Sequence, residues 1–267
     1  MLFIKSDHNK IITIGSDPEL FLVDKSGNFV SAIGKIPGTK NLPYPVPKFG
    51  RGSALQVDNV LVEYNTAPTT DLGTWATLHT GMLEHIKDRV SEFNLLPKIV
   101  AAAEMPESEL MDPAACVFGC DPDYNAWELQ PNPTPRSNNP RLRSAGGHIH
   151  IGVEGMTELE KINTTRAMDL LVGAYSVVHD PDTKRAELYG RPGAMRPKPY
   201  GIEYRTVSNF WLTDSGHMEN VFSFAQTAAK YNSRSFQHLK EKVYSMFRNR
   251  DKELAKQLAA ENFGVGL

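Results

Sequence analysis

The chain has 267 residues, of which 40% are hydrophobic, and its formal net charge is -2. This size allows a sizeable core, and the small charge gives no electrostatic reason to expect nucleic acid or an anionic membrane as a partner. No apolar stretch approaches the roughly 20 residues needed to cross a bilayer, and the N-terminal stretch lacks a basic region followed by an apolar run. The two cysteines, Cys116 and Cys120, are too few for a disulfide framework and lack the partners of a structural zinc site. We therefore expect one globular cytoplasmic domain over residues 1–267.

The first patterned segment, residues 11–23, is predicted to be a strand, with a return strand at 29–33. Successive side chains of a strand point to opposite faces, so Asp17 and Glu19 share one face while Leu20 and Leu22 share the other. Two carboxylates at this spacing repel one another unless a cation lies between them. Taken alone, the segment fits either a solvent-exposed edge strand or a metal site.

Residues 53–66 are predicted to form two strand pieces with a turn near Asp58. In the second piece Glu63 lies between apolar neighbours. A carboxylate there is costly if it faces the core without a partner, so it faces either solvent or a polar cavity.

The connecting segments contain helices, a further strand and two long loops. Apolar residues repeat every three or four positions over residues 70–93 and 156–179, which predicts two scaffold helices, the first with His79 on its exposed side. A strand is expected at 97–105, and from residue 214 the chain is largely helical. The loop at 34–52 is either a lid or substrate loop or an ordered surface excursion, and the loop at 106–140 either lines a pocket or wraps the surface.

The segment Ala145-Gly-Gly-His-Ile-His-Ile-Gly152 is the most informative stretch of the chain. In a strand, His148 and His150 share one face, and Ile149 and Ile151 share the other. The isoleucines suit a buried sheet face. Alone, the His-x-His pattern is weak evidence for a metal site, since structural histidines are common.

A basic stretch and a fourth patterned strand follow. Residues 185–200 contain several cations broken by Gly and Pro, which fits either a phosphate-binding loop or a solvated turn. In the strand predicted at 201–207, Glu203 and Arg205 share a face, while Ile202 and Tyr204 share the other.

Together these strands predict one polar face. A curved antiparallel sheet with helices on its apolar face would bring the polar pairs into one concave cavity. Carboxylate oxygens with two imidazoles favour magnesium or manganese over structural zinc. Hard cations beside several arginines are what phosphoryl transfer requires.

The order of these motifs resembles that of the type 2 carboxylate–amine ligases, amidoligases of which many are phage-encoded and which are related to glutamine synthetase and glutamate–cysteine ligase. The resemblance rests on Ile14-Gly-Ser-Asp-Pro-Glu-Leu-Phe-Leu22, Val62-Glu-Tyr-Asn-Thr-Ala-Pro68, the His-x-His segment and Gly201-Ile-Glu-Tyr-Arg-Thr206. It implies an α+β fold with a glutamine-synthetase-like core. A curved antiparallel half-barrel sheet would span about 11–212, with helices on its outer face and a helical part over about 213–267.

The resemblance further implies an ATP- and Mg²⁺-dependent (or Mn²⁺-dependent) ligase that joins a carboxylate to an amine through an acyl phosphate. The metal ligands it implies are Asp17, Glu19, Glu63, His148 and Glu203, with Asp58 as a further candidate. The residues it implies for the nucleotide are His150, Arg185, Arg191, Arg196 and Lys198, and those for catalysis are Arg205, Glu63 and Arg196. Asp58 depends on the turn at Asp58-Asn59, because across an unbroken strand it would lie out of phase with Glu63. The expected partners are small-molecule or peptide carboxylates and amines; both identities stay open, as does the oligomeric state.

Two other interpretations remain. The spacing His148-x-His150-x3-Glu154 is also that of a cupin metal site, which needs a later histidine, and His179 and His217 are the first available. Alternatively, the chain is a non-catalytic binding or structural protein on a ligase fold.

Overall fold

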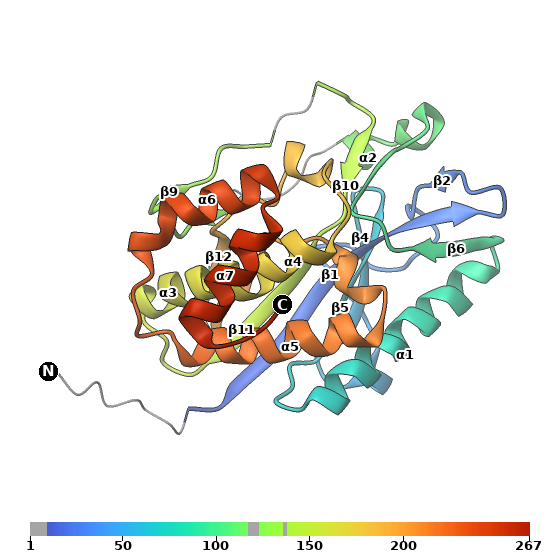
Figure 1. Ribbon diagram of the computed structural model, residues 1–267. Coiled ribbons are helices and arrows are strands. Elements are labelled where there is room, and N and C mark those ends of the chain that lie inside the picture. The colour runs from blue at the N-terminus through green and yellow to red at the C-terminus, as the bar shows by residue number, and fades with distance from the viewer. Residues whose placement is uncertain (1–9, 117–122, 136–137) are drawn as a thin grey trace, which may run out of the picture.

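The computed structural model of the chain describes residues 10–116, 123–135 and 138–267 (Figure 1). Cys120 lies outside these residues. Strand β1 (Ile12–Asp24) runs through the middle of the main sheet and pairs antiparallel with β11 (Gly147–Val153), β5 (Leu61–Asn65), β6 (Leu95–Lys98) and β2 (Phe29–Val30). The main path of the sheet is β3-β4-β5-β1-β11-β13-β12-β8-β9, and it does not close into a barrel.

The remaining strands have two to five residues each. They are β3 (Tyr44–Pro45), β4 (Ala54–Asp58), β8 (Tyr124–Asn125), β9 (Gln130–Pro131), β12 (Ala194–Lys198) and β13 (Gly201–Tyr204) in the main sheet, and β7 (Ala102–Glu104) with β10 (Leu142–Ser144) in a second pair. All the pairings named here are antiparallel. The fold is therefore the predicted mixture of helices with a curved antiparallel sheet.

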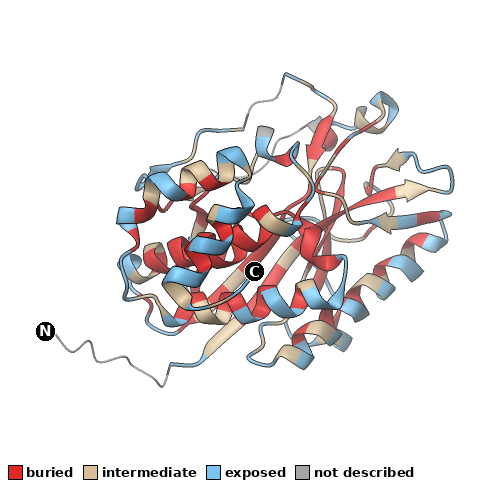
Figure 2. Ribbon diagram, in the orientation of Figure 1, coloured by how far each residue is buried: buried red, intermediate tan, exposed pale blue. Residues whose placement is uncertain are grey.

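Helices cover the apolar face of this sheet (Figure 1). They are α1 (Leu72–Ser91), α3 (Glu158–Met168), α4 (Ala174–His179), α5 (Ser215–Lys230), α6 (Lys240–Asn249) and α7 (Lys252–Phe263). The short helix α2 (Pro113–Cys116) belongs to the other face, where its Ala115 is buried in a second cluster with Phe21 and Leu61. There are 3₁₀ turns at Pro47–Phe49, Glu107–Leu110, Arg185–Glu187, Asn209–Leu212 and Gln237–Leu239. Helix α5 contacts both β1 and β11, and α3 contacts β12 and β13. Figure 2 shows the buried strands behind helices whose outward sides are exposed.

The core is formed by the side chains that alternate with the polar ones along each strand. Ile14, Leu20, Val62, Ile149 and Ile202 are fully buried against the helices. Because the side-chain period of a strand is two, this burial fixes the opposite residues on the other face. None of the described helices combines the length and the apolar character needed to span a bilayer.

Several local predictions need correction. The helix predicted at 156–179 is broken by a π-helical turn, Asp169–Gly173, between α3 and α4. The strand predicted at 97–105 is two strands, β6 and β7, with a break between them. Strand β12 lies inside the stretch that was predicted to be a basic loop.

His79 is not on the exposed side of α1, as predicted, but has no exposed surface. Its Nε2 lies 3.1 Å from Ser16 Oγ and its Nδ1 lies 2.8 Å from Tyr64 Oη. The ring also lies edge-on to Trp75 and Trp211. Burial lowers the pKa of His79 to about 3, so it is a neutral link between α1, β1 and β5.

Candidate functional site

The polar side chains of four neighbouring strands lie in register on one face of the sheet. Asp17 of β1 is paired with His148 of β11, and Glu19 with Glu63 of β5. His150 in turn is paired with Glu203 of β13. Since directly paired residues point to the same face, the structure brings these predicted residues together.

Two groups of possible metal ligands lie on this face, which we call the imidazole cluster (Asp17, His148 and Glu203) and the carboxylate cluster (Glu19, Asp58 and Glu63). In each, one possible ligand atom per residue lies within 4.8 Å of the others. The clusters are adjacent, because Asp17 and Glu19 are two residues apart on the same strand face.

The imidazole cluster is tightly paired. His148 Nδ1 lies 3.4 Å from Asp17 Oδ1 and 4.0 Å from Glu203 Oε1, while His150 Nε2 lies 2.9 Å from Asp17 Oδ1. Burial alone would raise the pKa of Asp17, but the contacts with His150 and His148 outweigh it and hold that pKa well below its usual value. Conversely, burial lowers the pKa of His150 and Asp17 raises it, with a net increase.

The carboxylate cluster depends on the hairpin between β4 and β5. Asp58 is paired with Leu61, so the chain turns at Asn59 and Val60, and Asn59 takes the left-handed φ of 55° that such a turn needs. Gln56 is paired with Glu63, and Asp58 lies two residues further along the same face as Gln56. The turn therefore places Asp58 beside Glu63, which an unbroken strand would not.

This second cluster carries more negative charge than its protein partners neutralise. Glu19 and Glu63 are only 8% and 6% exposed. Within the described part of the chain neither forms an ion pair with lysine or arginine, although Gly146 N donates to Glu19 Oε2 over 2.6 Å and Lys40 Nζ lies 3.8 Å from Asp58 Oδ2. Burial, followed by repulsion from Asp17, Glu19 and Asp58, raises the pKa of Glu63 well above its usual value. The all-oxygen donor set fits a hard divalent cation, which would remove this repulsion.

Three cationic side chains surround Glu203, on strand β13. Lys198 Nζ lies 2.7 Å and Arg196 Nη1 3.2 Å from its oxygens, and Arg205 Nη1 also donates to it. Burial and Asp17 raise the pKa of Glu203, but Arg205, His148 and Arg196 lower it further, to about 2. Arg205 also lies 3.5 Å from Asp123 Oδ2, a neighbour that the sequence did not indicate.

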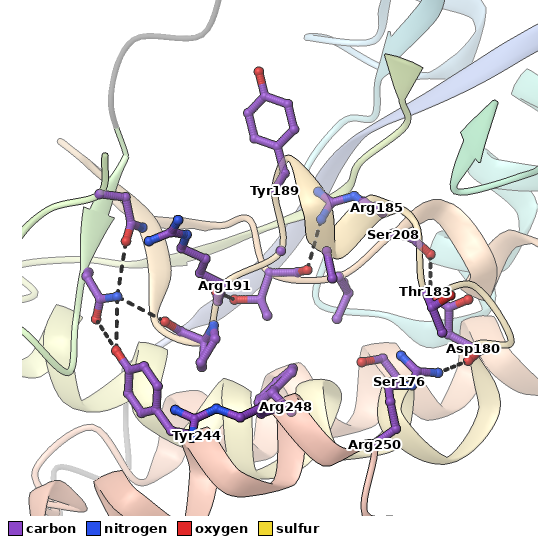
Figure 3. Close-up of a pocket in the computed structure, with 18 of the residues that line it drawn as sticks. Ser176, Asp180, Thr183, Arg185, Tyr189, Arg191, Ser208, Tyr244, Arg248 and Arg250 are labelled. Carbon is purple, nitrogen blue, oxygen red and sulfur yellow. Dashed lines mark hydrogen bonds between the residues drawn. The ribbon is translucent and has the colours of Figure 1, made fainter. Parts of the chain in front are cut away.

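Arg185 and Arg191 lie outside this group of contacts. The guanidinium group of Arg185 is buried and donates to the main-chain carbonyls of Ala145, Arg205 and Thr206. Its position supports the backbone on either side of the polar face. Arg191 is exposed and lines a separate pocket of about 690 Å³ beyond Thr206 (Figure 3).

A smaller pocket of about 320 Å³ is lined by His150, whose ring contacts Asp17 of the imidazole cluster. Gly15 and Gly152 contribute no side chain to its wall, and Asn65, Thr66 and Tyr200 complete it. The Tyr200 hydroxyl bonds to His150 Nδ1, and the two rings are stacked with centroids 6.0 Å apart. Tyr200 was not among the residues predicted from the sequence; its place directly before the β13 strand was the available signal.

The ligand set of a cupin does not form among the described residues. Glu154 is exposed in the turn after β11 and belongs to neither cluster. His179 and His217 pack against each other on α4 and α5, with ring centroids 5.4 Å apart. They lie with Tyr175 and Phe210, away from His148 and His150.

Comparison with known proteins found a protein family that matches part of the chain. The family described as "Phage phiEco32-like COOH.NH2 ligase-type 2" matches residues 140–263. That range includes His148, His150, Glu203 and Arg205, whereas the carboxylate cluster precedes it. No curated protein matches the chain.

Among solved structures, "Apo GmaS without ligand" is similar with a TM-score of 0.50 and 12% identity, over 96% of this chain and 64% of that chain. A "GmaS/ADP complex" has a TM-score of 0.43 and 12% identity, over 95% of this chain and 64% of that one. The glutamine synthetase of Plasmodium falciparum has a TM-score of 0.42 and 12% identity, over 84% of this chain and 52% of that one. The chain thus spans less than two thirds of the length of the solved chains named here. The predicted resemblance to the type 2 carboxylate–amine ligases is confirmed by the family match over residues 140–263, and the chain shares its fold with GmaS.

Proposed function

We propose that this protein is an ATP-dependent carboxylate–amine ligase that works with Mg²⁺ or Mn²⁺. The observation that carries the proposal is the pair of adjacent clusters on one sheet face, bordered by three cations on Glu203. Phosphoryl transfer needs divalent cations at the phosphate oxygens and fixed positive charge for the transition state. The ligase family match over residues 140–263 supports the same reaction class.

The donor sets indicate which residues would hold the cations. Glu19, Asp58 and Glu63 offer oxygen ligands whose mutual repulsion a cation would relieve, and Asp17, His148 and Glu203 offer a mixed set beside them. When bound, such cations would polarise the phosphate and neutralise its charge. Because Arg205, Arg196 and Lys198 already neutralise Glu203, the carboxylate cluster is the stronger of the two candidates.

The pocket beside His150 is our candidate for the nucleotide. Its glycines allow a flat group to approach the sheet, and Tyr200 supplies an aromatic wall. His150 lies between this pocket and Asp17, so a triphosphate extending from the pocket would lead toward the clusters. The nucleotide contacts implied for Arg196 and Lys198 agree with this direction, since both side chains reach Glu203.

In the proposed reaction an oxygen of the substrate carboxylate attacks the γ-phosphorus of ATP, forming an acyl phosphate and releasing ADP. The amine nitrogen then attacks the acyl carbon, phosphate leaves, and the nitrogen loses a proton to give the amide. Arg205 is placed to hold the reacting carboxylate and the charge that develops on it, because its guanidinium lies beside both Glu203 and His148.

The test is calorimetric titration with a non-hydrolysable ATP analogue, with and without Mg²⁺, on the wild type, Glu63→Gln and His148→Ala. We expect Mg²⁺-dependent binding that both substitutions weaken by about tenfold or more, as for loss of a charged ligand. Glu128→Gln is the matched control, since its carboxylate is paired with Lys240 instead. ADP release on addition of candidate acids and amines would then identify the substrates. Absence of nucleotide binding, with or without Mg²⁺, would contradict the proposal.

A further inference from the structure

The pocket of about 690 Å³ that contains Arg191 lies apart from the two metal-ligand clusters. Four segments distant in sequence form it: 125–133, 176–192, 206–208 and 244–250. Its volume falls within the few hundred to one thousand Å³ that is typical of small-molecule sites. The smaller pocket adjoins Tyr200, at the start of β13, whereas this pocket adjoins Thr206, beyond its end.

The walls of the pocket are held in place by their own hydrogen bonds. The Asn125 side chain donates to Asn132 Oδ1, to the Pro192 carbonyl and to Tyr244 Oη over 3.1–3.3 Å. On the other side, Thr206 Oγ1 donates to the Arg191 carbonyl over 3.0 Å, and Ser208 Oγ donates to Asp180 Oδ2 over 2.7 Å. A cavity whose walls are fixed in this way needs little reorganisation to accept a ligand.

Two arginines line the pocket on opposite sides. Figure 3 shows Arg191, from the segment before β12, and Arg248, from α6, on opposite walls. No other residue of the described ranges forms a hydrogen bond or ion pair with either guanidinium group. The three lining carboxylates each have a partner: Glu128 is paired with Lys240 at 2.9 Å, Asp180 accepts from Ser208, and Asp182 accepts from the main-chain N–H of Arg185.

Arg250 adds a third cation at a conformational cost. It ends α6 in the left-handed region, with φ 51°, where glycine or asparagine is usual. Its side chain returns across the pocket wall to donate to the Asp180 carbonyl. The lining also contains apolar side chains, with Pro131, Pro192 and Phe247 among them.

We propose that this pocket is a binding site for a small organic anion: a carboxylate or phosphate held between Arg191 and Arg248, with an apolar or aromatic body against the proline and Phe247 walls. Planar guanidinium groups bind both kinds of oxyanion by paired hydrogen bonds. An inorganic anion alone would leave the apolar walls exposed to water, and a neutral ring would leave the two arginines without a ligand partner. The pocket shares no residue with the two clusters or with the pocket proposed for the nucleotide, so Arg185 and Arg191, which the resemblance implied for ATP, line a different pocket.

The test is calorimetric titration with phenyl phosphate in the absence of divalent cations, with inorganic phosphate and benzyl alcohol as partial probes. We expect phenyl phosphate to bind the wild type more tightly than either partial probe. Arg191→Gln and Arg248→Gln should each weaken it by about tenfold or more, as expected for loss of a charged hydrogen-bond donor. Arg51→Gln removes an exposed arginine outside the pocket and should leave the affinity unchanged.

Glu63→Gln should also leave phenyl phosphate binding unchanged, which separates this site from the acidic face. The proposal is overturned if phenyl phosphate does not bind at millimolar concentration, or if its binding is equally strong in both arginine variants. It is also overturned if inorganic phosphate binds as tightly as phenyl phosphate, since the apolar walls then contribute nothing. None of these outcomes depends on ATP binding, so failure here is distinguishable from failure of the ligase proposal.

Discussion

Replacing Glu63 by glutamine tests whether the carboxylate cluster is built for a divalent cation. Glutamine has nearly the same shape but replaces one of three carboxylates whose possible ligand oxygens lie within 4.8 Å of one another. A cation present at one hundred times its dissociation constant stabilises a protein by about 2.7 kcal/mol. For a chain of this size, that corresponds to an increase in melting temperature of roughly 5–10 °C.

The variant should lose most of this effect. If the substitution weakens the site about a hundredfold, the same Mg²⁺ concentration would contribute only about 0.4 kcal/mol. Thermal unfolding in EDTA and in Mg²⁺, for the wild type and Glu63→Gln, measures both values. Glu128→Gln, whose carboxylate is paired with Lys240, should keep the full shift.

The metal-free proteins give a second comparison. The folded-state pKa of Glu63 lies above its unfolded value, so this group stabilises the fold at low pH and the contribution is lost as pH rises through the folded pKa. Glutamine does not titrate, so in EDTA at alkaline pH the variant should be at least as stable as the wild type. A variant that is less stable in EDTA and keeps the full Mg²⁺ shift would refute our account of the cluster.

Three further changes have defined outcomes. Burial raises the pKa of Asp169 to about 7, so the free energy of unfolding of the wild type should fall by about 2–3 kcal/mol from about pH 5 to pH 8. Urea unfolding measures this decrease, which should be absent in Asp169→Asn. His79→Ala removes a fully buried ring with two hydrogen-bond partners and should lower the free energy of unfolding, measured in urea, by about 3 kcal/mol or more. The control His238→Ala, at an exposed position, should lower it by less than about 0.5 kcal/mol. Tyr200→Phe removes the hydroxyl bonded to His150 and should weaken binding of the ATP analogue roughly threefold to tenfold in calorimetry. The melting temperature should not change, because Tyr200 is 46% exposed. Unchanged affinity would contradict a role for this pocket in nucleotide binding.

The polar face could be predicted from sequence because strand periodicity is strictly two. Once the isoleucines of Ala145–Gly152 were taken as core, the two histidines had to share the other face, and the same logic applied to Asp17, Glu19 and Glu203. What periodicity does not contain is the order of the strands. The sequence therefore indicated which side chains share a face, but not that Glu19 is paired with Glu63 or that Asp17 is paired with His148.

The failures have equally specific causes. His79 was placed outside because a histidine in an amphipathic helix is usually exposed, and no local signal shows that Ser16 and Tyr64 would satisfy both its ring nitrogens. The break in the second helix begins at Asp169, which accepts from Trp127 Nε1 and Tyr204 Oη, and helical periodicity does not indicate such contacts between distant segments. Which arginines of the basic stretch hold the nucleotide stays a prediction. In the structure, β12 directs Arg196 to the polar face, whereas Arg185 donates to main-chain carbonyls.

The two-residue connection at Asn59 and Val60 limits how this part of the gene can change. Adding or removing one residue there would shift β5 against β4 by one position and exchange its two faces, carrying Glu63 into the apolar core and Val62 onto the acidic face. A length change in this turn would therefore damage folding and the cation site in a single event. Substitutions that tolerate the left-handed φ of Asn59 remain open, with glycine or aspartate the first choices. Natural variants should consequently show a turn of constant length, and libraries built on this protein should vary its residue types but not its length.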